Sequence, residues 1–212
     1  VEQVIIGMIE QDSSFEHTYD NIDSVILYTS VELSNNSVMK CRWEGQASGG
    51  MNKKKVWVLT SPSFETTANR QVIIHEIGHN NNLLHAGEID CDTSFSLIKI
   101  IPDPIDICEI GEYDNPFDAM GKWNSLGFNY YHKQIAGWVK DNDIFTLENS
   151  DDFNKRYEIC SMQTKGKDKI KSIKYKYKDN YYLYIEYTGS RKVYSERLMF
   201  LLADRNKNNL NG

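Results

Sequence analysis

Short apolar segments alternate with polar turns over the first sixty residues of the chain. Residues 25–28 (Val-Ile-Leu-Tyr) and 56–59 (Val-Trp-Val-Leu) are rich in β-branched and aromatic side chains, which favours a strand at each place. Residues 4–6 form a third apolar segment, which fits either a strand or a helix end. Residues 48–50 (Ser-Gly-Gly) indicate a turn or a close backbone approach. This order predicts a mixed sheet that precedes a helix.

The hydrophobic pattern becomes helical in the next segment. At about 100° per residue, Ile73, Ile74 and Ile77 form one stripe, while two histidines and a glutamate fall on the opposite side. The stripe can face a core, and the polar side can face a cleft. The helix could begin at the Ser-Pro pair of residues 61–62, since proline is tolerated at the first helical position, or at the threonines of residues 66–67.

Two segments of different character follow this helix. Residues 86–116 contain glycine, proline and acidic side chains with little periodicity, which predicts irregular structure that forms the lower half of a cleft. Residues 123–140 are expected to form a second helix that ends near Gly137.

Beyond about residue 141 the pattern has the period of two that is typical of strands. Strands are predicted at residues 157–160, 170–177 and 181–187. Residues 178–180 would form the hairpin turn between the last two. Tyr194 and residues 198–202 could add further strands, and the polar end from residue 204 is expected to fray.

The composition limits the classes of partner. The chain has 212 residues and a formal net charge of -6, so it offers no strong basic field for nucleic-acid phosphates. The lysines within residues 53–55 and 169–178 are interpreted as exposed turn or strand positions. No apolar run approaches the ~18 residues of a membrane span. We therefore expect no nucleic-acid partner and no membrane span.

The number of cysteines and the first residues of the chain give weaker information about disulfides and about secretion. Four cysteines, Cys41, Cys91, Cys108 and Cys160, allow three pairings. A Cys91–Cys108 bridge would close the loop between these two residues, and a Cys41–Cys160 bridge would then link the N-terminal part of the chain to the C-terminal part. Four buried free thiols remain the alternative. The chain opens at a valine and shows no leader, which indicates a processed or excised chain. The sequon at Asn35 weakly favours secretion.

One motif carries most of the chemical information. His75, Glu76 and His79 begin the pattern H-E-x-x-H-x-x-N-x-x-H, which ends at His85. Histidines four residues apart lie on one face of a helix, so both imidazoles can reach one metal ion. His85 lies too far along the chain to share that face, so the chain must turn after the helix to bring it back. Glu76 can hold a metal-bound water without being a ligand.

Three protein ligands and one open position are typical of catalytic zinc rather than structural zinc. The string H-E-x-x-H alone occurs by chance, and a histidine pair on a helix can simply be solvated. A third histidine at the right offset and the turn-prone run at residues 80–82 favour the metal site. The predicted ligands are therefore His75, His79 and His85.

This pattern resembles the zinc motif of the metzincin metallopeptidases, H-E-x-x-H-x-x-G-x-x-H. The family's glycine ends the helix in a left-handed conformation. It corresponds here to Asn82, and asparagine is the next most tolerant residue at such a position. Metzincins also carry a turn with a methionine beneath the metal, and residues 117–121 (Phe-Asp-Ala-Met-Gly) look like that turn. The resemblance implies a supporting role for Met120, although a core methionine is the alternative.

Further segments look like the gametolysin group of metzincins. They are residues 41–47, 49–50, 114–121, 128–133, 136–138 and 181–187. The resemblance implies an α+β fold in which a metzincin-like zinc peptidase domain, residues 1–142, contains a mixed sheet, helices, the active-site helix and the methionine turn. A small β-rich C-terminal module, residues 143–212, would follow. It also implies an extracellular or cell-surface protein.

The activity that this resemblance implies is that of a zinc-dependent endopeptidase acting on extracellular proteins or glycoproteins. One catalytic Zn²⁺ would polarise the peptide carbonyl and lower the pKa of its water, and Glu76 would be the general base. Some metzincins place an oxyanion-stabilising tyrosine two residues after the methionine, but that position is Lys122 here. Tyr113, Tyr130 and His132 remain as candidates for that role.

Alternatives stay open. The fold could persist as a catalytically inactive binding or adhesion module, although the intact Glu76 argues against it. A zinc hydrolase of a non-peptide bond also fits the motif, but the resemblance gives it little weight. A Ca²⁺ site could draw on scattered acids, although a solvated acidic loop is the simpler interpretation. These acids are Asp103, Asp106, Glu109, Glu112, Asp114 and Asp118.

Overall fold

The computed structural model describes residues 24–30, 45–48, 54–60, 67–91, 108–122, 125, 127–140, 142–162, 164, 169–178, 180–189 and 196–204. The chain divides into two compact units, residues 1–81 and residues 82–212, which are described separately. Predicted features that lie outside the described residues include the strand at residues 4–6, the helix start at residues 61–62, the sequon, the glycines of residues 49–50, Tyr194 and the polar end after residue 204.

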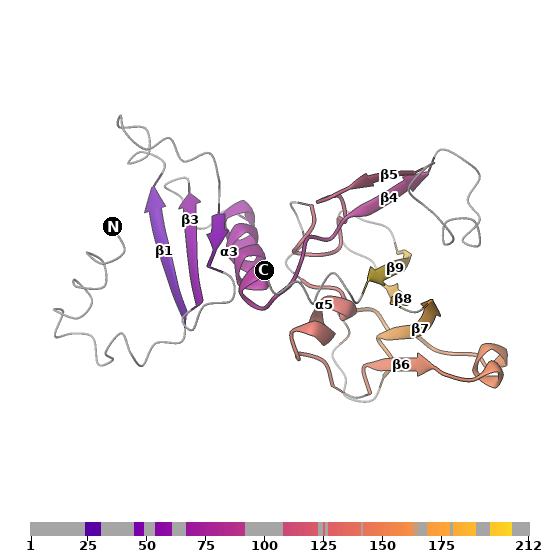
Figure 1. Cartoon of the computed structure of the whole chain (residues 1–212). Coiled ribbons are helices and arrows are strands. Elements are labelled where there is room, and N and C mark those ends of the chain that lie inside the picture. The colour runs from indigo at the N-terminus through magenta and orange to yellow at the C-terminus, as the bar shows by residue number, and fades with distance from the viewer. Residues whose placement is uncertain are drawn as a thin grey trace. The chain divides into compact units, whose positions relative to one another are not determined.

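A three-stranded mixed sheet forms the described core of the first unit (Figure 1). Its strands are β1 (Ser24–Ser30), β2 (Gly45–Ala47) and β3 (Lys54–Thr60), in the order β1-β3-β2. Strand β3 pairs parallel with β1 and antiparallel with β2. The strands predicted at residues 25–28 and 56–59 are confirmed as parts of β1 and β3.

Helix α3 (Thr67–Asn80) packs on this sheet through its apolar side chains. Val56 and Val58 of β3 are almost fully buried, and Val72, Ile73 and Ile77 of the helix pack against them. Burying a side chain of this size stabilises the fold by roughly 1.5–3 kcal/mol. The helix predicted from the isoleucine stripe is therefore confirmed, and Ile73 and Ile77 of that stripe pack towards the sheet.

The end of α3 is tied to the sheet by a buried amide. The side chain of Asn80 donates a 3.0 Å hydrogen bond to the carbonyl of Lys55 on β3. Its Oδ1 accepts a 3.4 Å hydrogen bond from the hydroxyl of Ser48, which follows β2. These two bonds fix where the helix stops relative to both strands.

The chain leaves α3 in the conformation that the sequence predicts. The N–H of Asn81 donates to the carbonyl of Gly78 at 2.9 Å, which closes a tight last turn. Asn82 then has φ 62, in the left-handed region that asparagine tolerates better than other side chains. The prediction that Asn82 takes the place of a helix-ending glycine is confirmed.

A short antiparallel ribbon begins the second unit. It consists of β4 (Glu88–Cys91) and β5 (Cys108–Gly111), with Glu88 opposite Gly111. The prediction of wholly irregular structure for residues 86–116 is wrong here, because each strand has only four residues, too few to give a readable period. The residues between the two strands lie outside the described part of the chain.

A second, four-stranded sheet has the order β6-β7-β8-β9. Its strands are β6 (Ile144–Leu147), β7 (Ser172–Lys178), β8 (Tyr181–Tyr187) and β9 (Leu198–Asp204). The predicted hairpin of β7 and β8 is confirmed, as is the strand over residues 198–202. Strand β6 pairs parallel with β7.

The strand predicted at residues 157–160 is wrong. A 3₁₀ helix, η3 (Ser150–Asn154), precedes this segment, and the segment itself joins no ladder. The N–H of Cys160 donates a single bond of 2.8 Å to the carbonyl of Ile170. An alternating pattern thus fits a segment outside any ladder as well as it fits a strand.

The second α-helix, α5 (Tyr130–Ile135), is shorter than the predicted helix over residues 123–140. Its N-cap, Asn129, is extended (φ -64, ψ 167) and accepts a 2.8 Å bond from the N–H of His132. Gly137 has φ 72, which ends the helix near the predicted position. The described residues between 123 and 129 are not helical, so the first part of the predicted helix is wrong for those residues.

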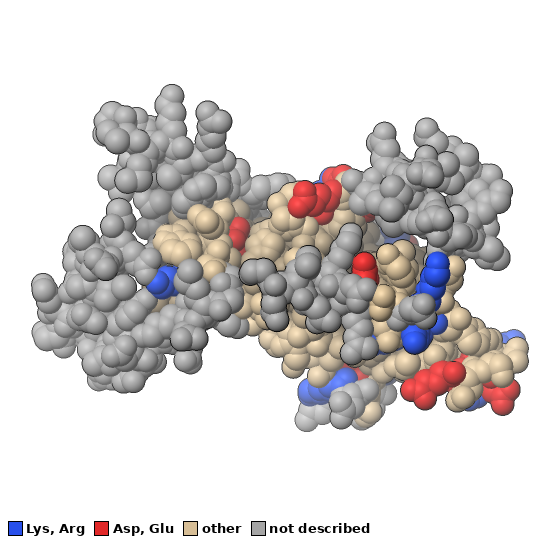
Figure 2. Space-filling view, in the orientation of Figure 1, with Lys and Arg blue, Asp and Glu red and all other residues tan. Residues whose placement is uncertain are grey.

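Two mixed sheets, the antiparallel β4–β5 ribbon, two α-helices and the 3₁₀ helix η3 make up the regular structure of the described residues. The metzincin-like fold and the domain boundary between residues 142 and 143 stay predictions. No helix within the described segments has the length and apolar character needed to cross a membrane. On the face drawn in Figure 2, described acidic and basic side chains are interspersed and form no single basic field.

Candidate metal centre

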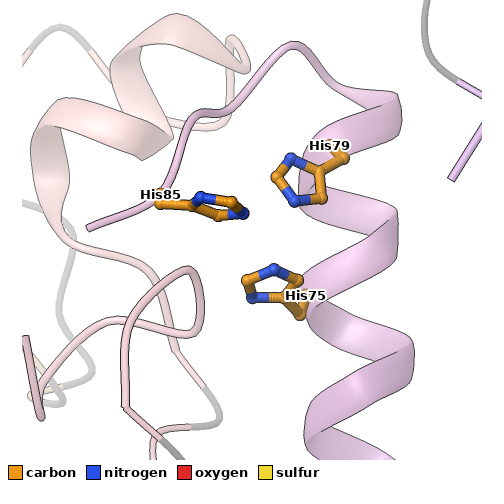
Figure 3. Close-up of side chains that lie close together, drawn as sticks. All are labelled: His75, His79 and His85. Carbon is orange, nitrogen blue, oxygen red and sulfur yellow. The ribbon is translucent and has the colours of Figure 1, made fainter. Parts of the chain in front are cut away.

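Three histidines converge at the end of α3 (Figure 3). His75 and His79 project from the helix, and His85 projects from the segment that follows it. One ligand atom from each side chain lies within 4.8 Å of the others, and all three side chains are half-buried. Among the described residues, no other group of three or more histidines, cysteines or acids has this arrangement.

The helix and its termination produce this convergence. The rings of His75 and His79, one helical turn apart, have centroids 4.7 Å apart and planes at 88°. The left-handed Asn82 reverses the chain three residues before His85. The predicted turn after the helix therefore has a local physical cause in the backbone of Asn82.

The ring of His85 has two further neighbours. Its Nδ1 lies 2.6 Å from Oε1 of Glu112, the residue after β5. The ring of Tyr113 lies against it, with centroids 3.9 Å apart and planes at 39°. Neither contact is visible in the sequence, because nothing there brings residues 112 and 113 back to residue 85.

Glu76 is buried rather than open to a cleft, with 7% of its surface exposed. Its carboxyl group lies against β2. A Cβ on Gly45 would come within 2.6 Å of Glu76 Oε1 and within 2.6 Å of Val72 Cγ1. Burial raises the pKa of Glu76 to about 7. The glycine at position 45 is therefore a requirement of this close approach.

The donor set fits zinc. Imidazole nitrogens are preferred zinc ligands, and nitrogens at about 2.0–2.1 Å from one tetrahedral ion lie about 3.4 Å apart. The three histidine ligand atoms, all within 4.8 Å of one another, need only small side-chain rotations to meet this requirement. Three such ligands leave a fourth position for a water or a substrate.

The turn around Met120 is buried and is attached to the chain beside His85. Met120 has no exposed surface and packs with Leu83 and Ala86. The N–H of Ala86 donates to the carbonyl of Met120 at 2.9 Å. The turn therefore supports the segment that carries the third histidine, and the supporting role of Met120 beneath the metal stays a prediction.

A buried aspartate organises this turn. Oδ1 of Asp118 accepts a 2.7 Å bond from the N–H of Met120. Its Oδ2 accepts a 2.6 Å bond from the N–H of Asn129 and lies 3.0 Å from Nδ1 of His132. Asp118 is fully buried and His132 is 4% exposed. The sequence places Asp118 in the predicted methionine turn and among the scattered acids, but it gives no sign of these hydrogen bonds, because Asn129 and His132 lie more than ten residues away.

The candidates for stabilising an oxyanion occupy different environments. Tyr113 contacts the metal-site residue His85. Tyr130 and His132 are buried, and burial raises the pKa of Tyr130 to about 12. Lys122 pairs with Asp114 at 3.2 Å. Among the described residues, Tyr113 is the one candidate of the three whose ring contacts a predicted zinc ligand.

Three acids of the calcium prediction have other partners, and the side chain of Glu109 lies outside the described part of the structure. Glu112 contacts His85, Asp114 contacts Lys122, and Asp118 serves the methionine turn. Asp103 and Asp106 lie outside the described residues. The calcium site stays a prediction without structural support.

The cysteines fall into two groups. Cys91 and Cys108 are opposite each other in the β4–β5 ladder, where Cα atoms are about 4.5–5.5 Å apart, a span that a disulfide can bridge. Cys160 is half-buried and free. Cys41 lies outside the described residues, so the Cys41–Cys160 pairing stays a prediction.

Comparisons of the chain with protein families, with curated proteins and with solved structures find no match. The resemblance to metzincins therefore depends on the motifs quoted from the sequence. Those motifs and the geometry of the histidine cluster are the two observations that indicate a function for this protein.

Proposed function

We propose that this protein is a zinc-dependent endopeptidase, with His75, His79 and His85 as the metal ligands and Glu76 as the general base. One observation carries the proposal. Three imidazoles offer ligand atoms within 4.8 Å of one another, and a carboxylate that is not among those ligands stands next to the first of them in the sequence. This combination favours catalysis over a purely structural site, which would use four protein ligands.

A bound zinc ion would supply Lewis-acid polarisation of the scissile carbonyl and a water of lowered pKa. The chain supplies the ligands in a fixed arrangement. His75 and His79 are held by a helix that is anchored on the sheet through Val72. His85 is held by the turn at Asn82 and by the contact with Glu112.

Glu76 would move the proton. Its carboxylate would take a proton from the attacking water and pass it to the nitrogen of the departing amine. Burial against β2 restricts the carboxyl group, since the space beside Gly45 is already occupied by Oε1. A restricted carboxylate has a defined position relative to the histidines, as general-base catalysis requires.

Protein or glycoprotein substrates and an extracellular or cell-surface location belong to the same proposal. Both depend on the resemblance to the gametolysin group. The described residues contain no helix that is long and apolar enough to cross a membrane, which agrees with the expectation of no membrane span.

The proposal is tested with a protease assay on the purified chain, with and without a metal chelator. We expect cleavage of unfolded protein substrates that the chelator abolishes and added zinc restores. Glu76→Gln should still fold and bind zinc, because the three ligands stay. Its cleavage rate should be about 10²–10⁴-fold lower than that of wild type, because the base is removed. Glu88→Gln, which neutralises an exposed glutamate on β4, is the matched control.

Two outcomes would redirect the assignment. Equal rates for Glu76→Gln and wild type would show that Glu76 is not the base. A wild-type chain that holds zinc but cleaves no peptide substrate would favour the inactive binding module or a hydrolase of another bond.

A further inference from the structure

The loop after β5 holds the ring of His85 through a carboxylate. Glu112 Oε1 lies 2.6 Å from His85 Nδ1, within the range of a charge-assisted hydrogen bond. An ionised carboxylate can only accept a hydrogen bond, so Nδ1 must carry the proton. In the neutral ring the lone pair is then on Nε2. The contact with Glu112 therefore selects the tautomer that presents Nε2 to a metal.

Figure 3 shows the ring of His85 facing the rings of His75 and His79. With Nδ1 engaged by Glu112, the nitrogen left for that direction is Nε2. Tyr113 covers the ring of His85 at a centroid distance of 3.9 Å. One bond therefore fixes the rotation of the ring, and one ring contact restricts its tilt.

Two glycines bring the Glu112 loop close enough for this contact. Gly87 follows His85 by two residues, and a Cβ there would come within 2.5 Å of the carbonyl oxygen of Gly111. Glu88 pairs with Gly111 in the β4–β5 ladder, which sets the register of the two segments. The distance between His85 and Glu112 is therefore set by backbone packing and does not depend on side-chain flexibility alone.

The contact contributes little to the stability of the fold. The side chain of Glu112 is 69% exposed and that of His85 is 23% exposed. Exposed ion pairs of this kind stabilise a protein only weakly, because solvent screens them and two side chains lose freedom. A carboxylate that orients a metal ligand, in contrast, typically changes metal affinity 10–100-fold when it is removed. The two roles therefore predict different experimental results.

We infer that Glu112 is a positioning residue for the metal centre, which fixes the tautomer and rotation of His85 so that Nε2 meets the ion. This inference rests on the proposed zinc function and deepens it. In this inference, the β4–β5 ribbon positions the carboxylate of Glu112 beside His85, the third histidine.

The test measures the zinc dissociation constant at pH 7.5 by competition with a chromophoric chelator. We expect Glu112→Ala to bind zinc about 10–100-fold more weakly than wild type. Glu112→Gln should lose less, because its amide oxygen still accepts a hydrogen bond from Nδ1. Glu88→Gln removes a nearby exposed charge without touching His85 and should bind within about twofold of wild type.

A second readout does not require zinc. Long-range ¹H–¹⁵N NMR spectra of the metal-free chain report which ring nitrogen of His85 carries the proton. We expect the Nδ1–H tautomer in wild type and in Glu88→Gln, and a mixture of tautomers in Glu112→Ala. The thermal unfolding of all variants should be nearly unchanged, as expected for an exposed contact.

The outcomes separate this inference from the proposed function. If wild type and Glu112→Ala bind zinc equally tightly, the inference is overturned while the peptidase proposal stands. An Nε2–H tautomer of His85 in the metal-free wild type would also overturn the inference. A wild-type chain that binds no zinc would overturn both.

Discussion

The N–H of Ala86 donates a 2.9 Å hydrogen bond to the carbonyl of Met120, so the residue after the third histidine is joined to a buried methionine turn. Leu83 and Met120 are almost fully buried in the same cluster. The side of the metal centre that carries His85 is thus supported by apolar packing and by backbone hydrogen bonding at once. Changes at Met120 should therefore affect both stability and metal binding.

Met120→Ala should destabilise the protein by about 2–5 kcal/mol, because it leaves a cavity in a buried cluster. Met120→Leu conserves most of the volume and should cost less than about 1.5 kcal/mol. Urea unfolding at neutral pH measures both values. An equal loss in the two variants would mean that packing volume is not what Met120 contributes.

His79→Ala should remove tight zinc binding, because two imidazoles remain where three converge. Metal analysis after dialysis against a weak chelator should find about one zinc per wild-type chain and almost none in the variant. Arg70→Ala is the control, since Arg70 is exposed on the same helix. Retention of one tightly held zinc by His79→Ala would contradict the ligand set.

Substitutions of Asn82 should follow the backbone conformation. Its φ of 62 favours glycine and asparagine over other residues. Asn82→Val should destabilise the fold by about 1–2 kcal/mol and weaken zinc binding, because a β-branched residue resists the turn that returns His85. Asn82→Gly should change the stability by less than about 0.5 kcal/mol. Chemical denaturation together with zinc titration tests both variants, and a neutral Asn82→Val would refute the argument.

Asp118→Ala should be strongly destabilising, by about 3–5 kcal/mol, because the N–H groups of Met120 and Asn129 and the ring of His132 would lose a buried partner. Asp151→Asn, at an exposed position of η3, should have almost no effect. Denaturant unfolding measures the difference. A loss below about 1 kcal/mol for Asp118→Ala would mean that water replaces the carboxylate.

Glu186 should make the stability depend on pH. Its side chain has no exposed surface, and Oε2 has no hydrogen-bond partner. Burial, together with a smaller contribution from the charge of Asp118, raises its pKa to about 8, although the N–H of Tyr130, the charge of Lys133 and the hydroxyl of Ser172 act in the opposite direction. The folded state therefore holds a proton that the unfolded state releases near pH 4.5.

The stability that comes from this bound proton is complete below about pH 4.5 and is lost as the pH rises towards 8. The Tm of wild type should fall by the order of 10 °C across that range relative to Glu186→Gln, which carries no ionisable group at this position. Calorimetric scans at several pH values measure the difference between the two curves. Parallel curves would contradict a buried, protonated Glu186.

The parts of the structure that the sequence predicted are those with local causes. The period of the isoleucines predicted α3, and the tolerance of asparagine for a left-handed backbone predicted the turn at Asn82. The spacing of three histidines predicted that their side chains could meet, and the cluster brings them together. Each of these features is determined by residues within about one or two helical turns.

The parts that the sequence did not predict depend on distant pairs. The contact of Glu112 with His85 needs the β4–β5 ribbon, whose four-residue strands have no readable period. The buried pair of Asp118 and His132 joins the methionine turn to α5 across a separation of 14 residues. In both cases an ordinary polar residue gains its role only through a chain reversal elsewhere.

Gly45 of β2 shows that the residues around the proposed metal centre also restrict a position in the sheet. The volume that a methyl group would need there is filled by the carboxyl of Glu76 and by Val72. Even Gly45→Ala would push the carboxyl group away from its place or tilt α3 away from β2. In a mutational scan, position 45 should therefore behave as a site of function, although glycine has no side chain with which to react, bind or ionise.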